Sequence, residues 1–269
     1  MRVATGLART GFSFIAASST SFFASSKINP SSGVVGLSLS SSSSSSYQDQ
    51  TNNEQCSNNM ILGKDYPELV VFDLDACFWD QEMYTMSSIP TADNVVTGKL
   101  GSEGKGVVGV YSGGDKISLH DGSMTAMQEI YSGAYPGMKV CFASSADTPF
   151  SEKVGKASLK LLEIVPGKTI WDFVVNDCWN GEDVNQIGRQ PPLSSNKAQT
   201  HFPRIRKLTG IPYDKMLFFD DCNWGDHCGM VARACQENGK SVVTHRTPRG
   251  LKLSDWRKGL ELYQKAHSK

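Results

Sequence analysis

The chain has 269 residues with 27 basic and 27 acidic side chains, so its formal net charge is zero. The two signs are unevenly distributed: residues 1–48 contain three bases and no acid, which leaves 24 bases and 27 acids for the other 221 residues. This mildly acidic body argues against a nucleic-acid partner, because nucleic acids are bound by clustered basic side chains. No apolar run reaches the ~18 residues that a membrane span needs. The seven cysteines show no regular pairing and fit a reducing compartment.

Residues 1–62 have the composition of a leader followed by a linker. The leader contains Arg2, Arg9 and Lys27 among many serines, which is typical of a transit peptide for a mitochondrion or a plastid. The alternative is a disordered N-terminus of a cytoplasmic protein. A tract of serine, asparagine and glutamine follows, and its apolar content is too low to form a core. We therefore expect the folded domain to comprise residues 63–269.

From Pro67 onward, short apolar runs alternate with helical patterns. The runs have the length and branching of buried strands and lie at 69–74, 138–143, 170–175, 216–219 and 241–245. Apolar residues recur at three- and four-residue steps within 124–131 and 150–164, as one face of a helix requires. A third helix is expected to end at Thr209, before Gly210, and a last one to begin near Ser254. This alternation predicts an α/β fold with a Rossmann-like, doubly wound parallel sheet.

Two segments interrupt the alternation. Residues 87–121 are rich in glycine and contain two β-type runs, which a Gly113-Gly114 turn would join into a hairpin. Residues 176–195 are expected to form a long loop. Both segments follow the ends of strands, on the side where open α/β sheets place their ligands.

Two pairs of acidic residues follow buried strands. Asp73 and Asp75 come at the end of the first strand, and Asp220 and Asp221 at the end of the fourth. If these strands are neighbours in a parallel sheet, all four carboxylates meet at one edge. Burying them there is costly unless a cation or a proton compensates. Oxygen-only ligation by carboxylates favours Mg²⁺.

Two further side chains complete a candidate phosphoryl-transfer site. Ser144 follows the second strand, where its hydroxyl could bind a phosphate oxygen, and Lys197 is expected at the start of the third helix, whose N–H groups attract anions. In such a site Asp73 would attack phosphorus to give an aspartyl-phosphate. Asp75 would protonate the leaving oxygen and then deprotonate water, while Mg²⁺ would offset the repulsion between Asp73 and the phosphate.

The order of these motifs resembles that of the haloacid dehalogenase (HAD) superfamily of aspartate-nucleophile phosphotransferases, and within it the eukaryotic magnesium-dependent phosphatases. The resemblance covers most of residues 67–246 and rests on LVVFDLDACFWD at 69–80, YSGGDKISLHDG at 111–122 and the long stretch at 197–226, KAQTHFPRIRKLTGIPYDKMLFFDDCNWGD. It implies a HAD-like domain in which the 87–121 hairpin replaces a large cap. It favours Asp221 over Asp220 as a metal ligand and adds the backbone carbonyl of Asp75.

The resemblance also implies an activity and a substrate class. The activity is that of an acid-type phosphoric monoester hydrolase, and the partner is a phosphorylated small molecule or a phosphoprotein. Family members are described as acting on phosphotyrosine proteins and on phosphorylated sugar adducts of amines, so a protein tyrosine phosphatase is one expected form.

The sequence departs from the family in several places, including Cys77 and a longer loop at 176–195. Ser145-Ala146-Asp147 follows Ser144, where the family usually has a basic residue beside the serine. Pro203 lies inside the predicted third helix, which it should kink or shorten. Three tryptophans follow strand ends and either line the substrate entrance or pack loops onto the core: Trp79, Trp179 and Trp224.

Two other functions are compatible with the same fold. A receiver-like phosphoacceptor domain carries its phosphorylated aspartate after the third strand, where this chain has Asn176-Asp177. A catalytically silent binding domain would need neither Asp73 nor Asp75. Because Asp75 supplies an acid/base for turnover, the pattern favours the phosphatase over both.

Overall fold

A computed structural model of the protein describes residues 65–268. The predicted leader and linker at 1–62 lie outside the described residues. Within the described part, none of the helices combines the length with the apolar character that crossing a bilayer requires.

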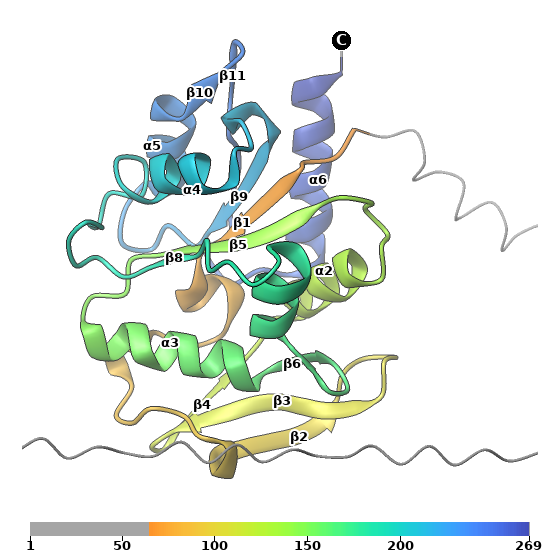
Figure 1. Ribbon diagram of the computed structural model, residues 1–269, viewed down its shortest axis with the longest axis vertical. Helices are drawn as coiled ribbons and strands as arrows, with labels where there is room; N and C mark the ends of the chain where they lie inside the picture. The colour runs from red at the N-terminus through yellow and green to blue at the C-terminus, as the bar shows by residue number, and fades with distance from the viewer. Residues whose placement is uncertain (1–64, 269) are drawn as a thin grey trace, which may run out of the picture. The chain divides into compact units, whose positions relative to one another are not determined.

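The core of the fold is a five-stranded sheet in which every neighbouring pair of strands is parallel (Figure 1). The strand order is β12-β9-β1-β5-β8, so the chain starts in the middle and extends the sheet first to one side and then to the other. This arrangement confirms the predicted α/β fold with a central parallel sheet. The strands are β1 (Leu69–Phe72), β5 (Lys139–Ser144), β8 (Gln186–Ile187), β9 (Met216–Asp220) and β12 (Val243–Arg246).

The register of the three central strands aligns their carboxyl ends. Phe72 of β1 lies opposite Phe142 of β5 and Phe219 of β9. The Phe72 and Phe219 rings stack with centroids 5.5 Å apart, and all three residues are fully buried. Directly beyond them, the backbone N–H of Asp73 donates to the carbonyl of Phe219 at 2.9 Å. The apolar strands therefore fix Asp73 beside the end of β9.

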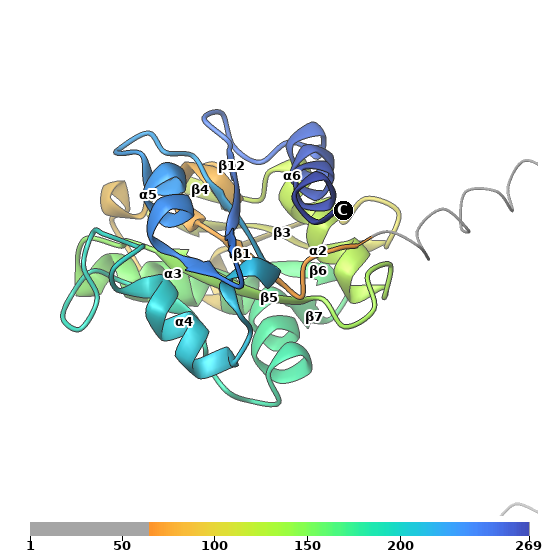
Figure 2. The ribbon, with the colours of Figure 1, turned by 90° about the horizontal axis from the view of Figure 1, so that it is seen from above.

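Helices cover both faces of the sheet (Figure 2). Helices α2 (Asp121–Tyr131) and α6 (Leu253–His267) pack against each other on one face, while α4 (His201–Thr209) and α5 (His227–Ala234) lie on the other. Helix α3 (Pro149–Leu161) contacts strand β3 (Lys105–Ser112), which belongs to the small sheet described below.

Most helix predictions agree with these bounds. Helix α4 ends at Thr209 with Gly210 in the left-handed conformation (φ 70°), as expected. It begins only at His201, so Pro203 lies in its first turn, where no intrahelical N–H bond is lost. Helix α6 begins at Leu253, with Lys252 rather than Ser254 at its N-cap.

The prediction of a third strand at 170–175 is wrong. This segment leads into an irregular helix at Asp172–Cys178, and β8 takes the sheet position next to β5. A short apolar run does not distinguish a buried strand from a buried helix turn. The helical signal is present in the polar residues, because Asp172 and Asn176 lie one turn apart and their side chains are hydrogen-bonded at 3.4 Å. The predicted loop at 176–195 accordingly contains both the end of this helix and β8.

The glycine-rich insert forms a three-stranded antiparallel sheet, below the main sheet in Figure 1. Its strands are β2 (Val95–Lys99), β3 (Lys105–Ser112) and β4 (Asp115–Ser118). The predicted hairpin is confirmed as β3–β4, and Gly113 adopts φ 61° in its turn. The sequence did not indicate β2, the third strand of this sheet.

The remaining elements are short. Two small hairpins are formed by β6 (Glu163–Val165) with β7 (Lys168–Thr169), and by β10 (Gln236–Glu237) with β11 (Lys240–Ser241). Irregular or 3₁₀ turns lie at Leu74–Phe78, Met83–Thr85, Ala92–Asn94 and Tyr213–Lys215.

Candidate active site

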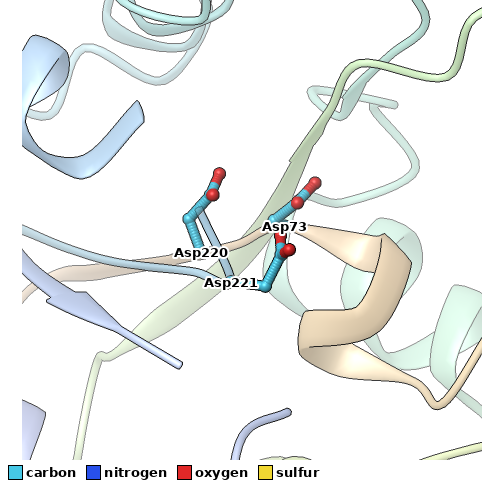
Figure 3. Close-up of side chains that lie close together, drawn as sticks. All are labelled: Asp73, Asp220 and Asp221. Carbon is cyan, nitrogen blue, oxygen red and sulfur yellow. The ribbon is translucent and has the colours of Figure 1, made fainter. Parts of the chain in front are cut away.

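Three carboxylates meet where β1 and β9 end (Figure 3). Asp73, Asp220 and Asp221 are buried, and each offers an oxygen within 4.8 Å of the others. The Lys197 ammonium lies among them, 2.8 Å from Asp73 Oδ1 and 2.6 Å from Asp220 Oδ2, and its side chain is 1% exposed. Lys197 lies in the turn that precedes α4 rather than in the helix itself, because α4 begins at His201.

Asp220 is fully engaged by its protein neighbours. Its Oδ2 accepts a hydrogen bond from the Lys197 ammonium and lies 3.2 Å from His227 Nδ1. Its Oδ1 accepts the Cys222 N–H at 2.8 Å. Burial opposes ionisation of Asp220, but Lys197 and His227 outweigh it and hold the pKa of this carboxyl well below its usual range. Asp220 is therefore an ionised anchor for Lys197.

The other two carboxylates lack comparable compensation. Burial raises the pKa of Asp73 well above its ordinary value, against the attraction of Lys197 and with the added repulsion of Asp220 and Asp221. Burial and the neighbouring Asp220 likewise raise the pKa of Asp221. The Asp221 Oδ2 accepts the Asn223 N–H at 2.9 Å. The cluster thus contains more acidic groups than cations within the described residues.

This excess of buried carboxylates fits a divalent cation. A set of oxygen ligands suits a hard ion such as Mg²⁺. Asp73 and Asp221 have oxygen lone pairs available for it, whereas both Asp220 oxygens already accept hydrogen bonds. The arrangement could hold one metal ion between Asp73 and Asp221.

Asp75 lies in the turn that follows β1 and lines the same cavity as Asp73. Its Oδ1 accepts the Trp79 indole N–H at 3.1 Å. Burial raises the pKa of Asp75 to about 7, although the hydrogen bonds from Trp79 and from the Met83 backbone act in the opposite direction. A carboxyl group with a pKa near 7 is suited to both giving and taking a proton at neutral pH.

Ser144 is held in place by a histidine that the sequence did not single out. The Ser144 carbonyl accepts hydrogen bonds from the Gly188 N–H at 2.9 Å and from His201 Nε2 at 3.1 Å. His201 Nε2 also lies 3.0 Å from the Gly188 carbonyl, and two carbonyl partners require this nitrogen to carry the proton. Burial, and secondarily Lys197, lowers the pKa of His201 to about 4, so it is neutral at physiological pH.

A cavity of about 430 Å³ opens over these groups. Five of the six predicted site residues line it, namely Asp73, Asp75, Ser144, Lys197 and Asp221, while Asp220 lies behind Lys197. Glu82, Tyr84, Asp147, Arg189 and Trp224 add further lining that the sequence did not predict as a group. They come from loops far apart in sequence, and only the fold brings them together.

The 87–121 insert contributes no side chain to this lining among the described residues. The segment between β1 and β2 contributes instead, through Glu82 and Tyr84. The predicted role of the hairpin as a cap therefore stays a prediction.

The three tryptophans have different environments. Trp224 is 73% exposed at the cavity, where its indole N–H donates to Glu82 Oε1 at 3.2 Å and its ring packs against Tyr84. Trp79 and Trp179 are buried, and the Trp179 N–H donates to the Val140 carbonyl at 2.8 Å. One tryptophan thus lines the entrance and two pack loops onto the core.

Comparison with known proteins identifies the family. A family model described as Acid Phosphatase matches residues 65–266, which is nearly the whole described domain. The chain belongs to the acid phosphatase family. This family is HAD-like, so the predicted membership of the haloacid dehalogenase superfamily is confirmed. No curated protein matched the chain.

Acid phosphatase membership supports a phosphatase that hydrolyses phosphorylated substrates. The fold also weakens the receiver-like alternative. The third strand along the chain within the parallel sheet is β8, and Gly188-Arg189-Gln190 follow it. The acidic residue that a receiver places after this strand is therefore replaced by glycine and a base.

Proposed function

We propose that the protein is a Mg²⁺-dependent phosphomonoesterase that works through an aspartyl-phosphate on Asp73. The observation that supports this most directly is the placement of Asp73 between Lys197 and Asp221, with Asp75 and Ser144 in the same cavity. A nucleophile, a proton donor and phosphate-binding groups thus face one space that is large enough for a small substrate.

In the first half-reaction, the Ser144 hydroxyl and the Lys197 ammonium bind oxygens of the substrate phosphoryl group. A carboxylate oxygen of Asp73 attacks phosphorus, and the bond between phosphorus and the ester oxygen breaks. Asp75, with its pKa raised to about 7, gives its proton to the departing oxygen. The products are the free alcohol or phenol and phosphorylated Asp73.

In the second half-reaction, Asp75 acts as a base. It takes a proton from water, the water oxygen attacks phosphorus, and the bond from phosphorus to Asp73 breaks. Inorganic phosphate leaves, and both aspartates regain their starting protonation. Water is the only co-reactant, so the atoms and charges balance.

Asp73 and Asp221, with the backbone carbonyl of Asp75, would hold Mg²⁺. Its positive charge offsets the repulsion between the Asp73 carboxylate and the phosphate dianion. Asp220 holds Lys197 through the 2.6 Å contact, so we assign it a positioning role rather than metal ligation.

The proposed substrates are phosphate monoesters of small molecules or proteins, including phosphotyrosine and phosphorylated sugar adducts of amines. The cavity and its exposed Trp224 leave room for a leaving group of either size. We further propose delivery to a mitochondrion or plastid, on the composition of residues 1–48. A fluorescent fusion of the full chain that stays in the cytosol would contradict that delivery.

Hydrolysis of an aryl phosphate by the full-length protein tests the proposed activity. We expect turnover with Mg²⁺, its loss with chelator and its recovery when Mg²⁺ is restored.

The Asp73→Asn variant should lose at least about 10³-fold in kcat, because it removes the nucleophile, while its circular dichroism spectrum stays that of the wild type. Asp93→Asn, an exposed change outside the cavity, is the matched control. Full activity of Asp73→Asn would sink the nucleophile assignment, and inactivity of the wild type with and without Mg²⁺ would sink the enzyme itself.

A further inference from the structure

Arg189 presents a guanidinium at the edge of the cavity that makes one long ion pair and no hydrogen bond within the described residues. Its side chain is 46% exposed and forms a long ion pair with Asp147 Oδ2 at 4.0 Å, which is beyond hydrogen-bond distance. Within residues 65–268 its guanidinium donates no hydrogen bond, so its five N–H donors remain available. Lys197 and His227, the other basic side chains that line the cavity, both contact Asp220.

The backbone around Arg189 is fixed to the loop that contains Ser144. β8 pairs with β5 through Ile187 and Ser144, and the next residue, Gly188, donates its N–H to the Ser144 carbonyl at 2.9 Å. Gly188 adopts φ 131°, a conformation that favours glycine. On the other side of Arg189, the side-chain amide of Gln190 (Nε2) donates to the backbone carbonyl of Asp147 at 2.9 Å. The base of the Arg189 side chain is therefore held at a set distance from Ser144.

Arg189 lies at the rim of the cavity and not at its floor. Ser144 and Lys197, which bind the phosphoryl group in the proposed mechanism, are each 1% exposed. The cavity of about 430 Å³ is in the range of sites that enclose whole small molecules. When the phosphoryl group occupies the floor, the leaving group extends past the rim, where Arg189 is the one base among the described lining residues that does not contact Asp220.

We propose that Arg189 determines substrate specificity by binding a second anionic group, a carboxylate or a second phosphate, on the leaving group of the substrate. The inference rests on the proposed phosphatase function. A guanidinium fork matches the two oxygens of a carboxylate or phosphate. A neutral leaving group that covered Arg189 would remove water from the guanidinium without supplying an opposite charge. Asp147 holds Arg189 only through the 4.0 Å ion pair, and its Oδ1 already accepts the Ser151 hydroxyl at 2.8 Å, so the guanidinium N–H donors stay free for a second acceptor.

Three aryl phosphates of the same shape test this proposal: 4-carbamoylphenyl phosphate, which is neutral at the second position, 4-carboxyphenyl phosphate and 1,4-phenylene bisphosphate. The measured quantity is the ratio of kcat/KM for each anionic substrate to that for the neutral amide. We expect the wild type to favour at least one anionic substrate by about tenfold or more, and which one it favours separates a carboxylate from a phosphate. The preference should shrink with rising salt concentration.

Variants then assign the preference to Arg189. We expect Arg189→Gln to lower the selectivity ratio at least about tenfold and Arg189→Lys to keep part of it. Arg249→Gln, which removes an exposed arginine that does not line the cavity, should keep the wild-type ratio. A ratio in Arg189→Gln within twofold of the wild-type value overturns the proposal, even if both substrates slow equally. A wild type that hydrolyses none of the three substrates overturns the phosphatase function itself, which is a distinct result.

Discussion

At the scale of single residues, the site separates two adjacent aspartates by what their oxygens contact. Asp220 accepts hydrogen bonds from Lys197 and from the Cys222 N–H, and it is fully buried. Asp221 accepts one backbone N–H and lines the cavity. Two neighbours in sequence thus have different proposed roles, positioning and metal binding. The family resemblance already favoured Asp221 as the metal ligand, but the two side chains are identical, and only their contacts give the physical reason.

The two roles predict different responses to Mg²⁺. Asp221→Asn should raise the Mg²⁺ concentration for half-maximal activity by about tenfold or more, because it removes a charged ligand. Asp220→Asn should lower kcat with little change in the Mg²⁺ requirement, because it loosens Lys197. Mg²⁺ titrations of aryl phosphate hydrolysis with both variants measure this. If Asp220→Asn has the larger shift in Mg²⁺ requirement, the assignment is reversed.

At the scale of elements, the position of α6 depends on a close approach to the sheet. Gly259 of α6 lies over β9, and a Cβ atom at this position would be 2.2 Å from Phe219 Cζ. Phe219 is fully buried and packs against Phe72 and Trp256. Its ring therefore has no free direction in which to move. The same ring lies one residue before Asp220, so this packing also supports the site.

Gly259→Ala should consequently lower the free energy of unfolding by about 1–3 kcal/mol, the usual cost of overpacking a core. The sign of this change in the free energy of unfolding is informative, because alanine in a helix is otherwise favoured over glycine by roughly 1 kcal/mol. Urea denaturation of the full chain measures the change. Gly114→Ala is the matched control, because a Cβ atom there meets nothing within 4 Å, and its effect should stay within about 0.5 kcal/mol. A stabilised Gly259→Ala protein would show that α6 can shift away from the sheet.

At the scale of the whole molecule, His201 joins three parts of the chain. It begins α4, and its Nε2 contacts the carbonyls of Ser144 at the end of β5 and Gly188 after β8. Because burial lowers its pKa to about 4, the unfolded chain takes up a proton at His201 at a higher pH than the folded chain does. The contribution of His201 to the free energy of unfolding is fully present above the unfolded pKa of about 6.5, and it decreases as the pH drops toward 4.

The expected loss between pH 7 and pH 5 is about 2 kcal/mol in the free energy of unfolding. Asp73 and Asp75, whose pKa values are raised, act in the opposite direction, so the total for the wild type is smaller. Comparing the wild type with His201→Gln isolates the histidine, since glutamine keeps an N–H donor without titrating. When the pH falls from 7 to 5, the free energy of unfolding should rise less, or fall more, in the wild type than in His201→Gln. Urea denaturation at both pH values measures this difference. Equal pH dependence of the two proteins would refute the assignment.

The sequence alone was sufficient for the parts of the molecule that local chemistry specifies. Apolar strands followed directly by Asp73 and Asp220 predicted parallel strands with acids at one edge, and the acid phosphatase match agrees with the superfamily predicted from those motifs. The prediction from sequence was wrong at 170–175, because a six-residue apolar run is compatible with both a strand and a buried helix.

Only the tertiary structure decided which groups face one another. Asp220 and Asp221 are distinguished by Lys197, whose ammonium reaches Asp220 from 23 residues away. Arg189 joins the cavity because β8 pairs with β5 at Ser144, a contact between strands that lie 43 residues apart. The amino-acid sequence identifies the side chains that carry the chemistry. Their charges, hydrogen bonds and exposure depend on neighbours that are distant in sequence. The paired acids of the body predicted a cation site, and the fold determines which carboxylates have oxygens free for the proposed ion.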